Sequence, residues 1–424
     1  MRAWPLLLVF LAGSALADMP TLTLEAVLAA TEATHPDLDL ARARQASASA
    51  SEQLAASLND FNLTLQATLG SGRNTYYGDR FHADSQARLD ARKTLFDAGR
   101  KRAGLLAARD LHGASDLQWL DARAQRRLTL MARYFDVLLA EMEYAADTEF
   151  MASAYVAWDN AKDRLAVGQI AQWELAELEA RYLDSRARRN EVLRRLRDAR
   201  MQLGLALNRT GPVQEELVDP KLVENERPLP EQTALLDAML AHNPRLLAQR
   251  QSLTAAQHRI EGVRADNRPS LEFAAEAGAW SREASTRNDL QAGFNFVWPI
   301  WQGGRVEAEM AREQANFQGL QAQTDKLQQE LRLNLADTWE EIQYLRESER
   351  ADRAAGVAYR DLALDRARAE YEMELKTNLG TSMAETQAAR LRRRGVEYRL
   401  ALALARMEAL LGIPLDALKM EEKK

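Results

Sequence analysis

Two kinds of apolar periodicity alternate along this chain. Steps of three and four residues, which predict amphipathic helices, run through two long tracts without proline, 37–211 and 300–413. The first tract has this rhythm at Leu120, Ala124, Leu128, Met131, Phe135 and Leu138. The second repeats the same steps at Leu327, Leu331, Leu335, Thr338, Ile342 and Leu345. Because proline in a helix interior costs about 3 kcal/mol, both tracts are predicted to be mostly long helix.

Strict alternation of apolar and polar residues, which predicts strands, appears in four short segments. They pair into two hairpins, at about residues 61–96 and 270–301, each inserted between long helices. Each strand is about ten residues long, the length of a tilted strand that spans a membrane. The large apolar residues of the alternating faces are Leu63, Leu65, Leu89, Phe273, Leu290, Phe294, Phe296 and Trp298.

The order of these elements occurs twice, about 205 to 208 residues apart. Short landmarks mark the copies: HPDL at 35–38 returns as NPRL at 243–246, LFDAGR at 95–100 as IWQGGR at 300–305, and QLGL at 202–205 as LLGI at 410–413. So long a period indicates one duplicated unit rather than a solenoid of small repeats. We predict a first repeat at 18–209, a proline-rich linker at 210–230, a second repeat at 231–415 and a disordered charged tail at 416–424.

The N-terminus predicts export. Arg2, the apolar run at 6–11 and the small residues at 15–17 are typical of a cleaved signal peptide over residues 1–17. The apolar run is too short to cross a bilayer, and we find no other candidate membrane helix. If the mature chain enters a membrane, it must therefore do so with strands.

Composition excludes several classes of function. The chain has no cysteine, which excludes disulfides and thiolate metal sites, and its net charge of −6 argues against a nucleic-acid partner. Its five histidines are scattered, and no phosphate loop, metalloprotease motif or nucleophile motif occurs. We predict that the protein is not an enzyme and has no cofactor and no metal site.

The two-faced hairpins allow two interpretations. Their apolar faces pack on a soluble core, or they contact lipid, and Trp298 at the end of the last strand is placed as an aromatic at a membrane interface. Export and the lack of residues to cover the hairpins favour lipid. Because the smallest outer-membrane barrels have eight strands, a chain with four strands would have to oligomerise to close one.

The ordered pairs of landmarks, together with the closing LGIP at 411–414, resemble the outer-membrane efflux proteins of the TolC family over about residues 22–415. The resemblance implies a mainly α fold with a membrane β-barrel part, formed as a homotrimer. Each chain would give four strands to a twelve-stranded outer-membrane barrel, and its helices would continue as an α-helical barrel through the periplasm. The linker would lie at an equatorial belt.

The resemblance also implies a function. The protein would be an exit duct in efflux or type I secretion, passively conducting substrate from an inner-membrane pump and a periplasmic adaptor to the outside. In the family the helical hairpins turn at a periplasmic tip, where the adaptor docks and the duct closes. The matching residues are Arg164, Val167, Gly168, Gln169, Lys376, Thr377 and Asn378. Candidates for an acidic gate there are Glu370, Glu372, Glu374 and Glu385, with a solvated helix face as the alternative.

The chain departs from the family pattern at four positions. Phe61 lacks the proline that opens the matching strand at Pro269, and His35 replaces the usual asparagine. Ala98 replaces the first glycine of a doublet, and Glu374 stands where the family has a glycine. A soluble periplasmic coiled-coil scaffold or adaptor is the alternative function, and for a duct the substrate class (drug, metal or protein) is open.

Overall fold

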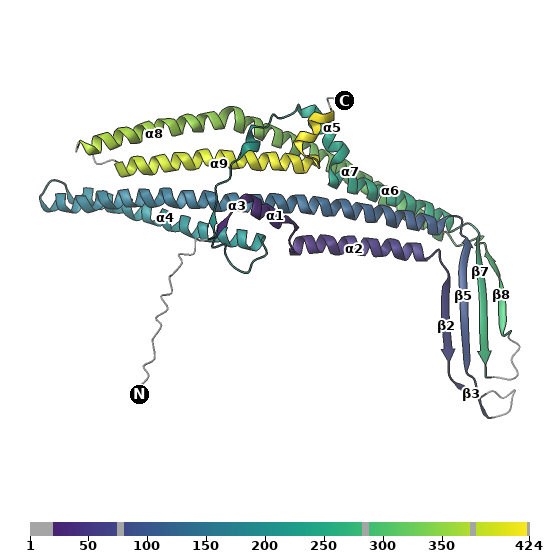
Figure 1. Ribbon diagram of the computed structural model, residues 1–424. Coiled ribbons are helices and arrows are strands. Elements are labelled where there is room, and N and C mark those ends of the chain that lie inside the picture. Colours follow the sequence, from purple (N-terminus) through teal and green to yellow (C-terminus); the bar gives the residue numbers. More distant parts are fainter. Residues whose placement is uncertain (1–19, 74–79, 282–287, 374–378, 422–424) are drawn as a thin grey trace, which may run out of the picture. The chain divides into compact units, whose positions relative to one another are not determined.

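The computed structural model describes residues 20–73, 80–281, 288–373 and 379–421 (Figure 1). The helices are α1 Leu24–Ala29, α2 Pro36–Ser57, α3 Arg100–Ala166, α4 Gln172–Ala206, α5 Gln232–His242, α6 Pro244–Ala265, α7 Arg305–Tyr344, α8 Arg350–Glu372, α9 Leu379–Leu411 and α10 Leu415–Glu421. The strands are β1 Thr21–Leu22, β2 Asn62–Thr68, β3 Ser71–Arg73, β4 Phe81–Ala83, β5 Gln86–Phe96, β6 Glu216–Leu217, β7 Ser270–Trp280 and β8 Leu290–Val297. The predicted signal peptide and four tip candidates, Glu374, Lys376, Thr377 and Asn378, lie outside the described residues.

The duplication read from the sequence is visible in matching helices. α2 and α6 each have 22 residues and begin with a proline. The side chain of His35 accepts a hydrogen bond from the Asp37 N–H at 3.2 Å, and Asn243 accepts one from the Leu246 N–H at 2.9 Å. Both side chains therefore cap their helix, because a capping residue needs an acceptor for the free N–H groups of the first turn. The exchange of asparagine for histidine preserves this role.

The long helices differ between the copies. α3 runs unbroken for 67 residues, several times the mean length of a helix, which confirms that the first proline-free tract is mostly long helix. In the second copy a π-helical turn, Leu345–Glu349, separates α7 from α8. Such turns insert an extra residue into a helix and shift the side chains that follow. The steps of three and four in the sequence do not reveal this interruption.

The two hairpins join into one antiparallel sheet with the strand order β2-β5-β7-β8. This confirms both predicted hairpins, and the pairing of β5 with β7 links them. A bulge lies between Thr94 and Phe96, so that Phe96 is the residue opposite Leu271. Simple alternation places Leu95 there instead, because a bulge adds one unpaired residue to its strand. The strands β3 and β4 form a separate small ribbon.

Each hairpin leads back into a helix through left-handed residues. Gly303 and Gly304 have φ values of 62° and 79°, and the matching Ala98 and Gly99 have 54° and 89°. A side chain in this conformation costs roughly 1–2 kcal/mol, and Ala98 bears that cost. The Asp97 carboxylate accepts hydrogen bonds from the N–H groups of Gly99 at 3.1 Å and Lys101 at 2.9 Å. These bonds cap α3 and help to hold the turn.

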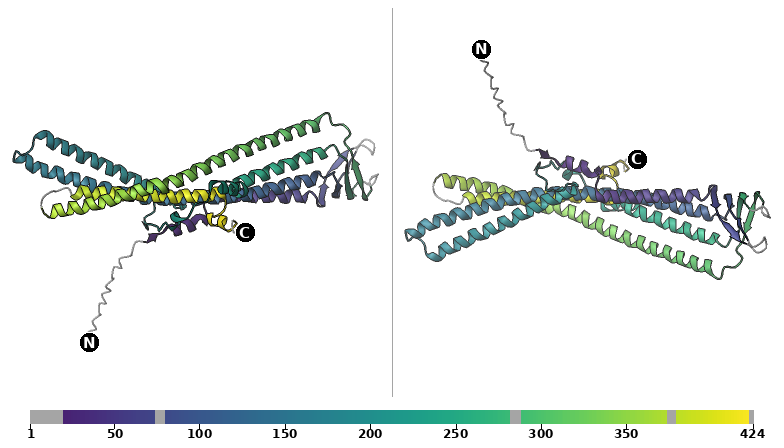
Figure 2. Two further views of the ribbon diagram at one scale, coloured as in Figure 1. Left: turned by 90° about the horizontal axis from the view of Figure 1, so that it is seen from above. Right: turned by 90° about the horizontal axis from the view of Figure 1, so that it is seen from below.

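The chain forms two compact units that do not coincide with the sequence repeats. The sheet unit comprises residues 34–126, 228–342 and those from 403 on, and the aromatic unit comprises residues up to 33, 127–227 and 343–402. Each unit draws on both repeats. In the sheet unit α2 lies along the first part of α3 (Figure 2), where the Gln45 amide donates to Asp116 Oδ1 at 2.8 Å. In the aromatic unit α4 lies along the last part of α3 and α9 along α8.

The aromatic unit has a tightly closed core. The rings of Phe135 and Tyr398 stack at 4.5 Å between centroids, and both are almost fully buried. The Tyr134 hydroxyl contacts the carbonyl oxygens of Leu22 at 2.9 Å and Val218 at 2.5 Å, next to the parallel pair β1 and β6. Burial raises the pKa of Tyr134 to about 12, since the charged phenolate is disfavoured away from water. The hydroxyl therefore stays protonated and tethers the linker to α3.

The linker is packed rather than loose. Asn225 is buried, and its amide donates to the backbone carbonyl of Glu397 at 3.0 Å and to its carboxylate at 2.8 Å. Arg394 forms a bidentate ion pair with Asp219, which also accepts a hydrogen bond from the Tyr398 hydroxyl at 2.6 Å. These bonds fix residues 219–225 against α9.

The tail differs from the prediction, because α10 extends through Glu421 where disorder was expected from residue 416. Leu415 is buried, and its N–H donates to Glu408 Oε1 at 3.3 Å. Among the helices of the described residues, none combines the length and apolar character needed to cross a bilayer.

Candidate functional site

One face of the four-stranded sheet is apolar. The register places Leu65 opposite Leu89, Leu89 opposite Ala277, and Ala277 opposite Leu290, so a single apolar row crosses all four strands. A second row pairs Phe273 with Phe294, whose ring centroids are 5.8 Å apart. The structure brings together on this face the predicted residues Leu63, Leu65, Leu89, Phe273, Leu290, Phe294 and Phe296. Trp298 follows the end of β8.

This apolar face is open rather than packed. The side chains of Leu65 and Phe294 are 72% and 69% exposed, and Trp298 is exposed as well. A continuous apolar surface of this kind marks contact with a membrane or a partner, because a soluble monomer rarely leaves one uncovered. The edge strands β2 and β8 each have one side without a strand partner in the described chain. Within the described chain, the sheet therefore has an uncovered apolar face and two unpaired edges.

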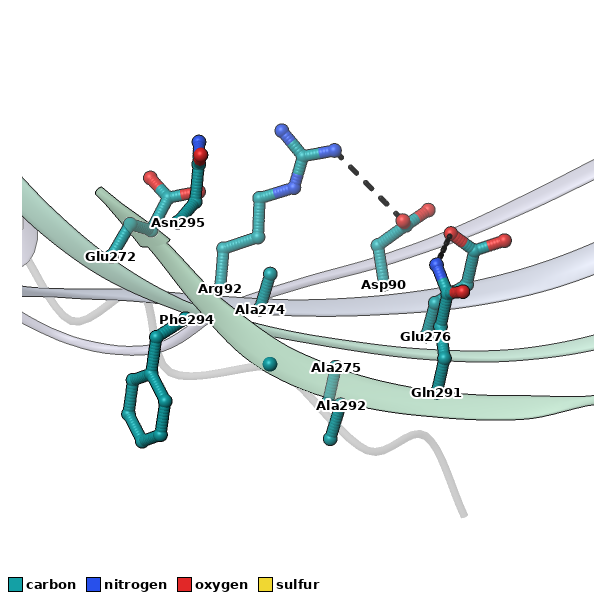
Figure 3. Close-up of a pocket in the computed structure, with 11 residues that line it drawn as sticks. Asp90, Arg92, Glu272, Ala274, Ala275, Glu276, Gln291, Ala292, Phe294 and Asn295 are labelled. Atoms are coloured by element: carbon teal, nitrogen blue, oxygen red, sulfur yellow. Dashed lines mark hydrogen bonds and ion pairs between the residues drawn. The ribbon is translucent and has the colours of Figure 1, made fainter. Parts of the chain in front are cut away.

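The opposite face is polar and charged (Figure 3). Arg92, Asp90, Glu272 and Asn295 point away from the side on which Phe294 lies. Asp90 and Glu276 are direct cross-strand partners, and Arg88 Nε lies 2.9 Å from Asp90 Oδ2. The Gln291 amide reaches Glu276 Oε2 at 3.5 Å. The sheet therefore has one apolar face and one charged face, a pattern that also occurs in strands between lipid and water.

The tip of the first repeat is a tight turn between α3 and α4. Gly168 has a φ of 73°, its N–H donates to the Leu165 carbonyl at 2.9 Å, and the Gln169 N–H donates to the Arg164 carbonyl at 2.8 Å. These bonds satisfy the last carbonyl groups of α3, and glycine suits the left-handed position. Val167 at the turn is largely exposed, as are Arg164 and Gln169. The turn presents these side chains to solvent.

The acidic gate candidates do not form one free cluster within the described residues. Glu370 pairs with Arg366 on its own helix at 2.8 Å, and Glu385 pairs with Arg360. Glu372, the last residue of α8, is exposed. Two of the carboxylates are thus partly neutralised by arginines, which the spacing of glutamates in the sequence did not indicate. Within the part of the chain that is described, no cluster of histidines and carboxylates is arranged to hold a metal ion.

Sequence reasoning missed a groove between the two repeats in the aromatic unit. Its lining comes from α3 and from the ends of α8 and α9, with Val156, Tyr371 and Met383 among the exposed side chains. The hydroxyls of Ser153 and Thr381 are 2.9 Å apart, and Gly380 lies against Ser153. The signal available in the sequence was the run of small residues at 152–154 and 380–382, since small side chains allow helices to approach closely.

Comparison with known proteins agrees with this geometry. Residues 235–412 match the model of the family described as outer membrane efflux protein. No curated protein is similar enough in sequence to match the chain. The fold is shared with solved structures of low sequence identity, so these show the architecture alone.

Three of these structures illustrate the likeness. CusC, whose structures concern folding and transmembrane channel formation, superposes with a TM-score of 0.74 at 18% identity and covers 92% of both chains. VceC from Vibrio cholerae gives 0.73 at 18% identity, covering 92% of this chain and 96% of its own. The channel CmeC from Campylobacter jejuni gives 0.73 at 16% identity, covering 95% and 89%.

Three observations agree with one another. The second repeat matches the family model, nearly the whole chain shares the architecture of the solved structures, and the sheet has one apolar and one charged face. The described fold has long helices and one four-stranded sheet, and it superposes on these structures over more than nine tenths of the chain. Residues 235–412, the greater part of the second repeat, therefore resemble the outer membrane efflux proteins, and the chain as a whole shares the fold of CusC, VceC and CmeC.

Proposed function

We propose that this chain is an outer-membrane efflux protein of the TolC family and forms the exit duct of a tripartite efflux or type I secretion system. The observation that carries the proposal is the four-stranded sheet with an open apolar face and a charged opposite face. In lipid the apolar face would be covered by acyl chains, and the charged face would line water. The duct conducts passively, and an inner-membrane pump supplies the energy.

The open sheet edges support assembly as a homotrimer. An unpaired strand edge in hydrocarbon leaves backbone N–H and C=O groups without partners, at several kcal/mol per group. Pairing of β8 with β2 of the next copy satisfies both edges, and three copies give a closed barrel of twelve strands. The exported helices would then extend into the periplasm, after cleavage of residues 1–17.

The helical tips are the proposed docking surface for a periplasmic adaptor. The exposed turn at Arg164, Val167, Gly168 and Gln169 supports this role, and residues 376–378 of the second repeat are assigned to it by the same family pattern. Among the gate candidates that the structure describes, Glu372 has the strongest support, because Glu370 and Glu385 are paired with arginines. The substrate class is not assigned.

The alternative, a soluble periplasmic scaffold, explains the long helices equally well. It offers no reason for Leu65 and Phe294 to stand exposed on one continuous face. It also offers no reason for the carboxylates and arginines of the same strands to lie together on the other face.

Fractionation and gel electrophoresis test the proposal. We expect the mature protein in the outer-membrane fraction, and we expect an unheated sample to migrate as a trimer that boiling converts to a monomer. Purified trimers should conduct ions in planar bilayers. A monomer that stays soluble without detergent in the periplasmic fraction would refute the duct and support the scaffold.

A further inference from the structure

The polar face of the sheet holds two carboxylates in direct opposition. Asp90 on β5 and Glu276 on β7 are cross-strand partners. Like charges at such positions destabilise a sheet, because their side chains lie within a few ångströms of one another. Both carboxylates are largely shielded, since their side chains are only 13% and 25% exposed. Something must offset their repulsion.

Arg88 is placed to do so. It lies two residues before Asp90 on the same face of β5, and its Nε is 2.9 Å from Asp90 Oδ2. Its Nη1 is 3.9 Å from Glu276 Oε1, and its Nη2 donates to Gln66 Oε1 on β2 at 2.9 Å. One guanidinium therefore links β2, β5 and β7. Gln291 on β8 extends the chain of contacts to the last strand through Glu276.

The charges of this face do not cancel. Within the four strands its charged residues are Arg88, Asp90, Arg92, Glu272 and Glu276, which leaves one excess negative charge per chain. Arg92 is 3.9 Å from Asp90, and its side chain is mostly exposed. In Figure 3 it lies on the same face as Glu272 and Asn295. Around a pore with threefold symmetry this pattern repeats three times. Rings of charge on the wall of a narrow aqueous pore favour ions of the opposite sign.

We propose that Arg88 is a selectivity-determining residue of the barrel, because it masks the Asp90 and Glu276 pair and limits the preference of the pore for cations. The five charged residues form what we call the charged belt. The inference rests on the proposed duct, in which this face lines the lumen. It locates a determinant of selectivity in the sheet, in addition to the acidic candidates at the helical tip.

Ion selectivity in planar bilayers tests the role of Arg88. The wild-type trimer should prefer cations weakly in a potassium chloride gradient. Arg88→Gln changes the belt from one to two excess negative charges per chain. The cation-to-anion permeability ratio should rise by about twofold or more, because one such charge changes the electrostatic energy of a monovalent ion in the pore by on the order of RT. The double variant Asp90→Asn with Glu276→Gln leaves one excess positive charge per chain and should reverse the preference. Both changes should shrink at high salt.

Lys93→Gln is the matched control. Lys93 lies on the same strand but opposite Phe273 on the apolar face, with its ammonium 4.8 Å from the Phe61 ring. It removes the same charge as Arg88→Gln, and the permeability ratio should not change. Trimer yield on unheated gels shows whether each variant assembles.

The possible results separate the two hypotheses. If wild-type trimers do not conduct, the proposed duct fails. If they conduct while Arg88→Gln and the double variant leave the ratio as in the wild type, the duct stands and the belt does not set selectivity. If Lys93→Gln changes the ratio as much as Arg88→Gln does, the face assignment is wrong. Should Arg88→Gln fail to assemble, the double variant alone decides, and an unchanged ratio overturns the proposal.

Discussion

The sheet and the aromatic core use the same residue types in opposite ways. In the core Phe135 is 1% exposed and stacks on Tyr398, and the chain itself supplies every neighbour. On the sheet Phe294 is 69% exposed, although it stands in an equally apolar row. The core is completed within one chain, whereas the sheet lacks a cover and two edge partners. The difference shows which region of the chain is left to be covered and paired by something outside it.

Truncating the buried ring in the core should cause the largest loss in the free energy of unfolding. Phe135→Ala removes a buried aromatic and leaves a cavity, at a cost of about 3–5 kcal/mol in the free energy of unfolding. The same truncation on the sheet, Phe294→Ala, should cost within about 1 kcal/mol, because the ring is already exposed in the chain. Thermal unfolding of the detergent-solubilised protein measures both. Equal losses would show that the sheet ring is as enclosed as the core ring.

A carboxylate introduced on the apolar face should reduce membrane assembly, whereas one introduced on the charged face should not. Phe294→Asp places a carboxylate toward lipid and should lower the yield of trimers in the outer membrane, at a cost of up to about 2–4 kcal/mol per chain depending on depth. Asn295→Asp is the neighbouring control, since its side chain lies on the charged face and should leave the yield nearly intact. Membrane fractions probed by immunoblotting give both yields. Similar yields for the two variants would contradict the face assignment.

The turn at the tip is held by hydrogen bonds within the chain, so a substitution at Gly168 should lower the thermal stability. Gly168→Ala forces a side chain into a φ of 73°, at a cost of roughly 1–2 kcal/mol. Gly168→Asn should lose less, because asparagine tolerates this conformation better. The midpoint of thermal unfolding should fall in that order. A midpoint that is the same for alanine and asparagine would mean that the turn is reshaped in the assembled protein.

The smallest effect is expected at the gate candidate. Glu372→Gln removes one exposed charge per chain with little change in size, and we expect a modest fall in cation preference in planar bilayers, smaller than the change caused by Arg88→Gln. Arg366→Gln is the companion variant, because it removes the positive charge paired with Glu370 and should shift the preference the other way. Unchanged selectivity in both variants would show that these glutamates form a solvated helix face and not a gate.

The sequence by itself determined the local elements and their faces. Alternation around Phe294 and the steps of three and four around Phe135 depend only on neighbours along the chain, so the hairpins and the long helices were predictable. Proline at 36 and 244 and the landmarks beside them revealed the duplication. The resemblance of these ordered landmarks extended the prediction to a family and, through it, to a channel.

Tertiary structure decided what depends on residues far apart in the chain. The pairing of β5 with β7 brings Asp90 of the first repeat opposite Glu276 of the second. No pattern among neighbouring residues predicts this contact. It likewise placed Arg88 between them and assigned Arg360 to Glu385. Periodicity states which face a side chain occupies, but the charge that a face presents depends on which partners the fold places within reach of each other.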